Sequence, residues 1–179
     1  LTKDSFAKLK YKESLVSDYF KSMIAQIGEN LVLNDLSIFK KDNENFSYYI
    51  HNSYKKNIGK IISLIKYNSN QIDEKIKLLS KNLCMHVAAM KPESLDISDL
   101  DKMIVDREKS IQKELILNSG KPSNIVEKIL DGKMNKFYSD VTLLNQLYIL
   151  DQDKTVSKII DEHSKDYDYK ILSFNLITL

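Results

Sequence analysis

The chain has 179 residues, enough for one sizeable hydrophobic core. With 42% hydrophobic and 29% charged residues, its composition is that of a folded globular protein and excludes a disordered or fibrous one. The 27 lysines and arginines against 25 acidic residues leave a net charge of +2 without any polybasic block, and no apolar run approaches the roughly 20 residues of a membrane span. We therefore expect no direct nucleic-acid partner and no membrane association.

The N-terminal third of the chain predicts one helix followed by strands. Apolar residues recur at near-helical spacing over residues 1–26, and Gly28 ends the pattern. Three segments rich in apolar or β-branched residues follow at 31–39, 48–51 and 60–67, separated by polar turns at 40–45 and 52–57. Neighbouring strands joined by short turns favour an antiparallel sheet.

Helices dominate the next part of the chain. After the third strand the apolar period changes from two to about 3.6, which predicts an amphipathic helix over residues 72–90 that ends before Pro92. A helical hairpin is expected over residues 98–138. The Ser98 hydroxyl would cap its first helix, and Gly132 would break its second helix into two parts.

The last part of the chain predicts an amphipathic helix over residues 155–165 and a closing strand over residues 169–179. In that strand Leu172, Phe174 and Leu176 alternate with other residues and should point the same way. The order of helix, strands, helices and strand predicts an α+β fold. We expect an antiparallel three- to four-stranded sheet backed by helices in two layers, with a helical hairpin insertion.

The sequence carries no recognisable catalytic or metal-binding pattern. A single cysteine, Cys84, excludes an intramolecular disulfide and indicates a reducing, intracellular environment. Cys84 and His86 lie about 200° apart around a helix, so they cannot act together as nucleophile and base or share a metal; we interpret both as core residues. His163 has no second ligand at a useful spacing. We predict no catalytic residues, no cofactor and no metal, with a thiol hydrolase acting through Cys84 as an alternative.

Seven short stretches occur together in the order and spacing of one protein family. They are IGEN at 27–30, YIHN at 49–52, MHVAAMKP at 85–92, SGKP at 119–122, KILDGKM at 128–134, KF at 136–137 and KTV at 154–156. The set resembles elongation factor Ts over nearly the whole chain. The resemblance implies that residues 1–30 are a remnant of the family's N-terminal core subdomain. Residues 31–179 would be its C-terminal core subdomain, of the dimerisation type, including the helical hairpin at 98–138.

The resemblance implies a guanine nucleotide exchange factor rather than an enzyme. Members of the family bind elongation factor Tu carrying GDP and expel the nucleotide, in a bacterial cytoplasm or in the matrix of an organelle, mitochondrion or plastid. The positions that correspond to the family's contacts with the GTPase domain of elongation factor Tu are Ile27, Gly28, Tyr49 and His51. Those that correspond to its contact with the third domain are Ile149 and Leu150.

Some features depart from the family or allow other interpretations. Asn34 and Asp35 stand where members usually carry two arginines. The helical module and the Thr-Asp-Phe motif by which the family disturbs the Mg²⁺ site of elongation factor Tu would lie upstream of Leu1, so we expect docking with poor nucleotide exchange. Ile27, Ile149 and Leu150 could instead be core residues, Gly28 a helix cap, and His51 a local hydrogen-bonding residue. The alternative function is a self-associating assembly module that forms a homodimer.

Overall fold

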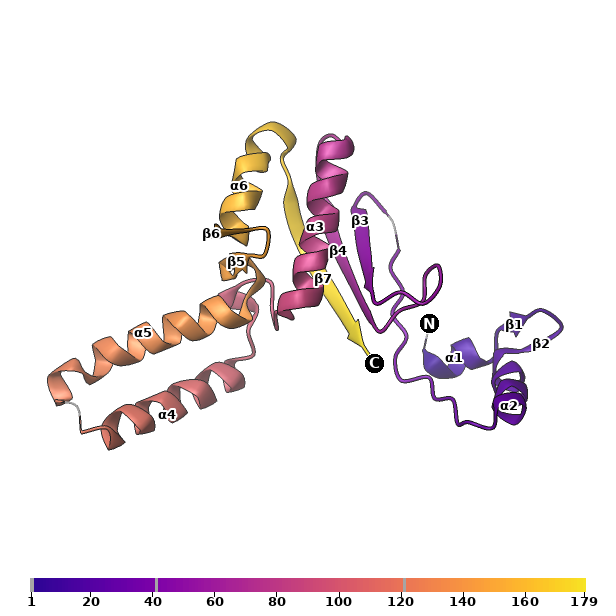
Figure 1. The fold of residues 1–179 in the computed structure, drawn as a ribbon, viewed down its shortest axis with the longest axis horizontal. Helices are drawn as coiled ribbons and strands as arrows, with labels where there is room; N and C mark the ends of the chain where they lie inside the picture. The colour runs from indigo at the N-terminus through magenta and orange to yellow at the C-terminus, as the bar shows by residue number, and fades with distance from the viewer. Residues whose placement is uncertain (1, 41, 121) are drawn as a thin grey trace. The chain divides into compact units, whose positions relative to one another are not determined.

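The computed structural model describes residues 2–40, 42–120 and 122–179, which form two compact units (Figure 1). The first unit is Leu1–Asp42 and the second is Asn43–Leu179, whereas the sequence placed a division after residue 30. Leu1, Lys41 and Lys121 lie outside the described residues. Part of the helix expected at 1–26, of the turn expected at 40–45 and of the SGKP motif at 119–122 therefore lies outside them too. The assignment of these parts to the subdomains of the family stays a prediction.

The first unit holds two helices separated by a small β-hairpin. Its elements are α1 (Lys3–Ala7), β1 (Lys10–Tyr11), β2 (Ser14–Leu15) and α2 (Val16–Ile27). The expectation of one continuous helix is therefore wrong. Lys12 adopts a left-handed backbone with φ of 55°, which a tight turn needs, and Leu15 is extended at the N-cap of α2.

The expected strand at 31–39 is also wrong, because the described residues 29–40 form neither helix nor strand. Apolar content alone does not make a strand, since each backbone N–H and C=O needs a partner across a ladder. The Asp35 carboxylate instead accepts a hydrogen bond from the backbone N–H of Leu36, and the Lys3 ammonium donates to the carbonyl of Asn34. Val32 remains 65% exposed.

The second unit is built on a three-stranded antiparallel sheet. Its strands are β3 (Asn45–His51), β4 (Ile61–Asn68) and β7 (Lys170–Thr178), in the order β3-β4-β7. A register shift between Lys66 and Tyr67 moves the alternation of β7 by one residue. Ile171 therefore joins the core beside Phe174 and Leu176, and the prediction that Leu172 points the same way is wrong.

Helices cover one face of this sheet, which confirms the predicted α+β class. Helix α3 (Glu74–Met90) packs on β3 and β4, and α6 (Val156–Tyr167) contributes to the same core. The Asp73 carboxylate accepts the N–H of Ile76 at 2.9 Å and starts α3, and Lys91 ends it in a left-handed conformation. None of the described helices is long and apolar enough to cross a membrane.

A two-helix hairpin extends from this unit (Figure 1). After the short helix η1 (Ile97–Asp99), α4 (Lys102–Asn118) and α5 (Ser123–Val141) pack together. Ser98 lies inside η1 and is not the cap that the sequence suggested, because the Asp101 carboxylate accepts the N–H of Met103 at 2.8 Å. The predicted break at Gly132 is also wrong.

Helix α5 continues through Gly132 because its apolar side is buried. Glycine inside a helix costs about 1 kcal/mol relative to alanine. Val126, Leu130 and Met134 of α5 pack with Ile116 of α4 in one buried cluster, and this contact offsets the weak helical preference of the glycine. The helical hairpin is therefore two uninterrupted helices.

Candidate functional site

Two of the predicted site residues, Ile27 and Gly28, lie together at the C-terminal end of α2 in the first unit. Ile27 is 48% exposed and is therefore not a core residue. Gly28 is left-handed, with φ of 74°, and its N–H donates to the carbonyl of Ile24 at 2.9 Å. A Cβ at Gly28 would meet no atom within 4 Å, so the position needs the conformational freedom of glycine rather than space.

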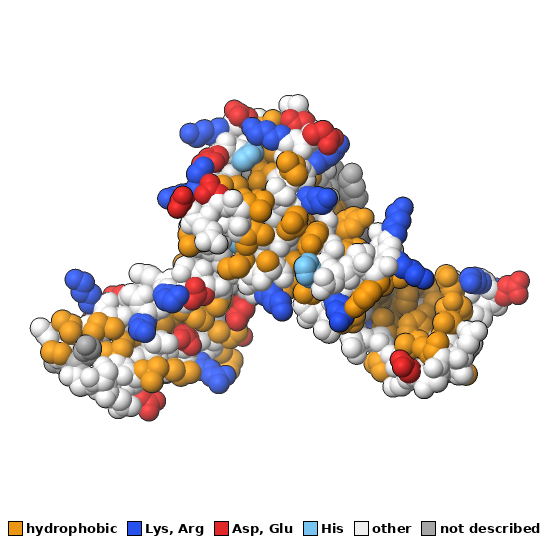
Figure 2. All heavy atoms as spheres, in the orientation of Figure 1, with side chains coloured by type: hydrophobic (Ala, Val, Ile, Leu, Met, Phe, Trp, Pro, Cys, Tyr) orange, Lys and Arg blue, Asp and Glu red, His pale blue; other side chains and the backbone are white. Residues whose placement is uncertain are grey.

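The second unit contains a groove of about 380 Å³ that brings three predicted residues together. Its walls come from β3, β4, α3 with the residue that follows it, and the loop between two short strands. The lining residues are Tyr49, His51, Ile61, Met85, Ala88, Ala89, Lys91 and Ile149. Figure 2 shows hydrophobic side chains gathered over this part of the second unit.

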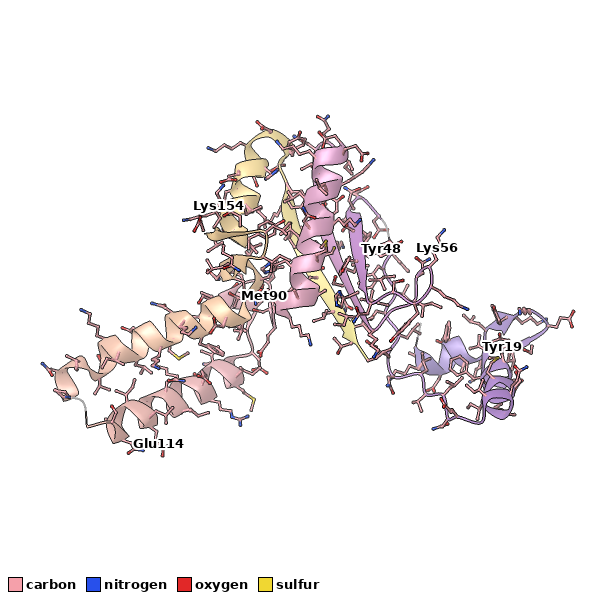
Figure 3. All side chains as sticks on the ribbon, in the orientation of Figure 1. Tyr19, Tyr48, Lys56, Met90, Glu114 and Lys154 are labelled. Atoms are coloured by element: carbon pink, nitrogen blue, oxygen red, sulfur yellow. The ribbon has the colours of Figure 1, made fainter. Side chains whose placement is uncertain are left out.

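Tyr49 and His51 form the polar edge of the groove. They alternate along β3 and so share the face that α3 covers, whereas Tyr48, labelled in Figure 3, directly precedes Tyr49 in the strand and is 57% exposed. The Tyr49 hydroxyl lies 3.1 Å from Nδ1 of His51. Local hydrogen bonding of His51 is therefore present. When the hydroxyl donates to Nδ1, the neutral imidazole carries its hydrogen on Nε2 and presents a donor there.

The backbone at the end of β3 is held by a glycine that the sequence reasoning missed. A Cβ on Gly59 would lie 2.3 Å from Cγ2 of Ile50 and 2.7 Å from the carbonyl oxygen of His51. Only glycine fits such a close approach. The available signal was a glycine in an Asn-rich loop, where Asn52 and Asn57 both have positive φ. The loop after β3 thereby closes against His51.

The apolar pair Ile149 and Leu150 lies at the tip of a small β-hairpin. The turn η2 (Leu143–Asn145) leads into β5 (Leu147–Tyr148), which pairs with β6 (Asp151–Thr155). Ile149 is half-buried and lines the groove, whereas Leu150 is 57% exposed and is therefore not a core residue. The pair presents one side chain to the groove and one to solvent.

A buried histidine lies directly behind this hairpin. His86 is fully buried, Nε2 lies 2.9 Å from Oε1 of Gln146, and the backbone N–H of Ile149 donates to Nδ1 at 3.3 Å. The ring also stacks on Tyr148, with centroids 5.9 Å apart. Desolvation lowers the pKa of His86, so the imidazole is neutral at pH 7. The interpretation of His86 as a packed, hydrogen-bonded residue is confirmed.

The groove is suited to binding rather than to bond making. Its apolar floor is bordered by a phenol, an imidazole and the Lys91 ammonium, which can receive an apolar side chain and a neighbouring acidic group. Cys84 is fully buried and burial raises the pKa of its thiol to about 12, which contradicts the thiol hydrolase alternative. Among the described residues, no three His, Cys, Asp or Glu side chains gather as a metal site.

Comparison with known proteins places these features in a family. The family model described as elongation factor TS matches residues 2–179. The chain belongs to the elongation factor Ts family. It is 35% identical over 180 residues to elongation factor Ts of Ehrlichia ruminantium (strain Welgevonden), covering 96% of this chain and 62% of that protein. Identity is 39% over 158 residues with the Ehrlichia canis protein, covering 88% and 55% of the two chains.

A protein from another bacterial genus gives a similar result. Elongation factor Ts of Clostridium acetobutylicum is 35% identical over 153 residues, covering 86% of this chain and 48% of that protein. The chain thus spans about half to three fifths of the length of these curated relatives. The family is named for a translation elongation factor.

Proposed function

We propose that this member of the elongation factor Ts family binds elongation factor Tu in its GDP form and promotes GDP release. The observation that carries the proposal is the groove of the second unit. Tyr49, His51 and Ile149, which the family resemblance assigned to partner contact from distant parts of the sequence, line this one exposed depression. A factor of this kind would act in a bacterial cytoplasm or an organelle matrix.

The proposed action is a coupling between two binding events. The chain would bind nucleotide-free elongation factor Tu more tightly than the GDP form, and linkage then requires GDP to weaken binding of the chain by the same factor. A coupling of about 3 kcal/mol corresponds to a change of roughly a hundredfold in each affinity. Contact with the GTPase supplies this coupling, and the chain itself forms no bond to the nucleotide.

The test uses two substitutions on the same small hairpin. Ile149→Ser removes an apolar wall of the groove, whereas Leu147→Ser changes a residue that is 55% exposed on β5 and does not line it. Loss of a buried isoleucine contact is worth about 1.5–3 kcal/mol, so Ile149→Ser should weaken binding to immobilised elongation factor Tu by on the order of tenfold or more. Leu147→Ser should leave the affinity within about twofold of the original chain.

Two results would contradict the proposal. The first is an original chain with no measurable affinity for elongation factor Tu, and the second is an equal loss of affinity in both variants. The release of a fluorescent GDP from elongation factor Tu, followed in the same samples, measures the exchange step separately from docking.

A second candidate function is self-association through the helical hairpin. Ile104, Ile111 and Leu115 lie on one side of α4 and are 42%, 42% and 58% exposed. A second copy of the chain could cover this apolar stripe. Light scattering with and without elongation factor Tu separates the two functions, because a stable homodimer indifferent to elongation factor Tu would favour assembly.

A further inference from the structure

We propose that His86 and Gln146, which do not line the groove, position its Ile149 wall and thereby set the affinity for the partner. This inference rests on the proposed function, since it concerns the same surface. The two side chains are 0% and 1% exposed and form one continuous chain of hydrogen bonds from the tip of the β5–β6 hairpin to the ends of two helices.

The direction of each hydrogen bond follows from backbone groups alone. The N–H of Ile149 can only donate, so Nδ1 of His86 accepts. The hydrogen of the neutral ring then lies on Nε2 and is donated to Oε1 of Gln146. The Gln146 amide nitrogen in turn donates to the carbonyl oxygens of Asp140 and Met90, at 2.7 and 3.4 Å. One tautomer of His86 and one orientation of the Gln146 amide satisfy all of these hydrogen bonds.

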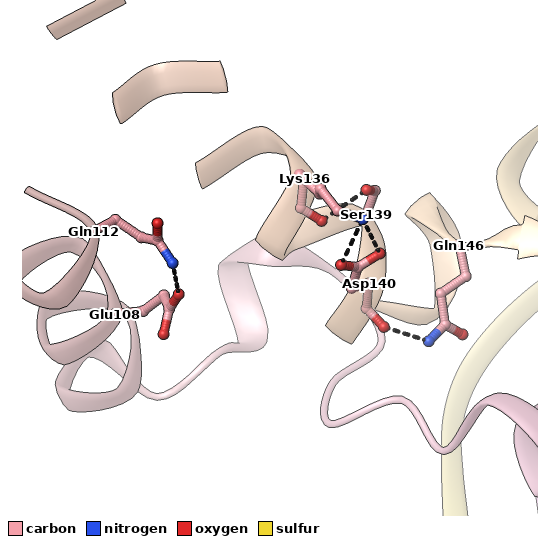
Figure 4. Close-up of polar contacts among 6 residues, drawn as sticks. All are labelled: Glu108, Gln112, Lys136, Ser139, Asp140 and Gln146. Carbon is pink, nitrogen blue, oxygen red and sulfur yellow. Dashed lines mark hydrogen bonds and ion pairs between the residues drawn. The ribbon is translucent and has the colours of Figure 1, made fainter. Parts of the chain in front are cut away.

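These bonds join two elements that line the groove, α3 and the β5–β6 hairpin, to the end of α5. Met90 is the last residue of α3, and the preceding Ala88 and Ala89 form one wall. Asp140 lies in the last turn of α5, and Figure 4 shows the Gln146 amide reaching its carbonyl from the segment that follows. Ile149 lines the groove from the tip of the β5–β6 hairpin. The place of Ile149 relative to α3 is therefore set by His86 and Gln146.

Other contacts hold the hairpin in the fold without fixing its tip. The N–H of Val156 donates to the Gln146 carbonyl at 3.0 Å, and Leu143 and Val156 are fully buried. Only the bond to His86 ties the backbone of Ile149 itself, among the hydrogen bonds that the described residues show for it. Removal of that bond should release the tip while the core remains folded.

Two substitutions of His86 separate positioning from packing. An asparagine oxygen lies close to the place of Nδ1 and can still accept the Ile149 N–H, so H86N should keep affinity for elongation factor Tu within about threefold. A glutamine amide lies close to the place of Nε2 and meets Gln146 instead, so H86Q should weaken the affinity by about tenfold. Tyr169→Phe is the matched control, because it removes a buried hydrogen bond of 3.0 Å to Ser80 away from the groove.

The readouts combine binding, unfolding and amide exchange in the full chain. All three variants should lower the free energy of urea unfolding, but H86Q alone should lose affinity and exchange the Ile149 amide hydrogen faster. In the original chain, ¹⁵N spectra of the imidazole should show a protonated Nε2 and an unprotonated Nδ1. The opposite tautomer, or equal affinities of H86N and H86Q, would overturn the inference.

Failure of the proposed function remains distinguishable from failure of this inference. A chain that does not bind elongation factor Tu refutes the function, while the tautomer and the Ile149 amide exchange still decide whether His86 ties the hairpin tip. If the Ile149 amide hydrogen exchanges in H86Q at the rate of the original chain, the proposed tie between His86 and the hairpin tip is refuted, even where binding to elongation factor Tu is intact.

Discussion

Replacement of Gly59 by alanine should perturb the groove, although Gly59 does not line it. The new Cβ would lie 2.3 Å from Cγ2 of Ile50 and 2.7 Å from the carbonyl oxygen of His51, and the second of these atoms is backbone. The end of β3 or the loop after it must therefore move. Overpacking of this kind costs about 1–3 kcal/mol, which for a chain of this size lowers Tm by about 2–12 °C.

Gly132 provides the matched control for the same substitution. A Cβ there meets no atom within 4 Å, and the residue lies inside α5. Gly132→Ala should raise the unfolding free energy by about 0.5–1 kcal/mol, because alanine favours the helix. Thermal unfolding by circular dichroism measures both variants. Equal stability of Gly59→Ala and the original chain would refute the reasoning, and so would destabilisation by Gly132→Ala.

Three further predictions concern single side chains. Asp101→Ala should lower the unfolding free energy by about 1 kcal/mol, while Ser98→Ala should change it little; equal effects in urea titrations would contradict the assigned cap. Cys84 should react with a thiol reagent only upon unfolding, and rapid labelling of the native chain would oppose its burial. The pKa of His86 is lower in the folded chain than in the unfolded chain, so the free energy of unfolding should be highest above about pH 6.5 and should fall as the pH drops below that value. A free energy of unfolding that does not change with pH in denaturant titrations would count against this.

Local signals predicted the parts of the fold that depend on neighbours in sequence. The apolar period over residues 72–90 and the proline that follows predicted α3 within two residues, and alternation predicted β7. Elements that depend on distant partners were less predictable. Residues 31–39 have strand-like composition but no ladder, and the register shift at Lys66 displaced Leu172 from the core face.

The groove required both the family resemblance and the fold. Tyr49 and His51 share a face because β3 is a strand, which the apolar segment at 48–51 after a polar turn predicted, but their meeting with Ile149 depends on how the β5–β6 hairpin packs beside α3. Gly59 was missed because its role is a close approach between segments that the sequence does not display. Gln146 was not among the predicted site residues, and its hydrogen bonds to helix ends became visible in the fold.

The affinity of the chain for elongation factor Tu, measured with and without GDP, tests the central claim most directly. Isothermal titration with nucleotide-free elongation factor Tu and with its GDP complex gives both dissociation constants under one set of conditions. We predict tighter binding to the nucleotide-free form, by a factor equal to the weakening of GDP binding that the chain causes. Equal dissociation constants for the two forms would contradict the account.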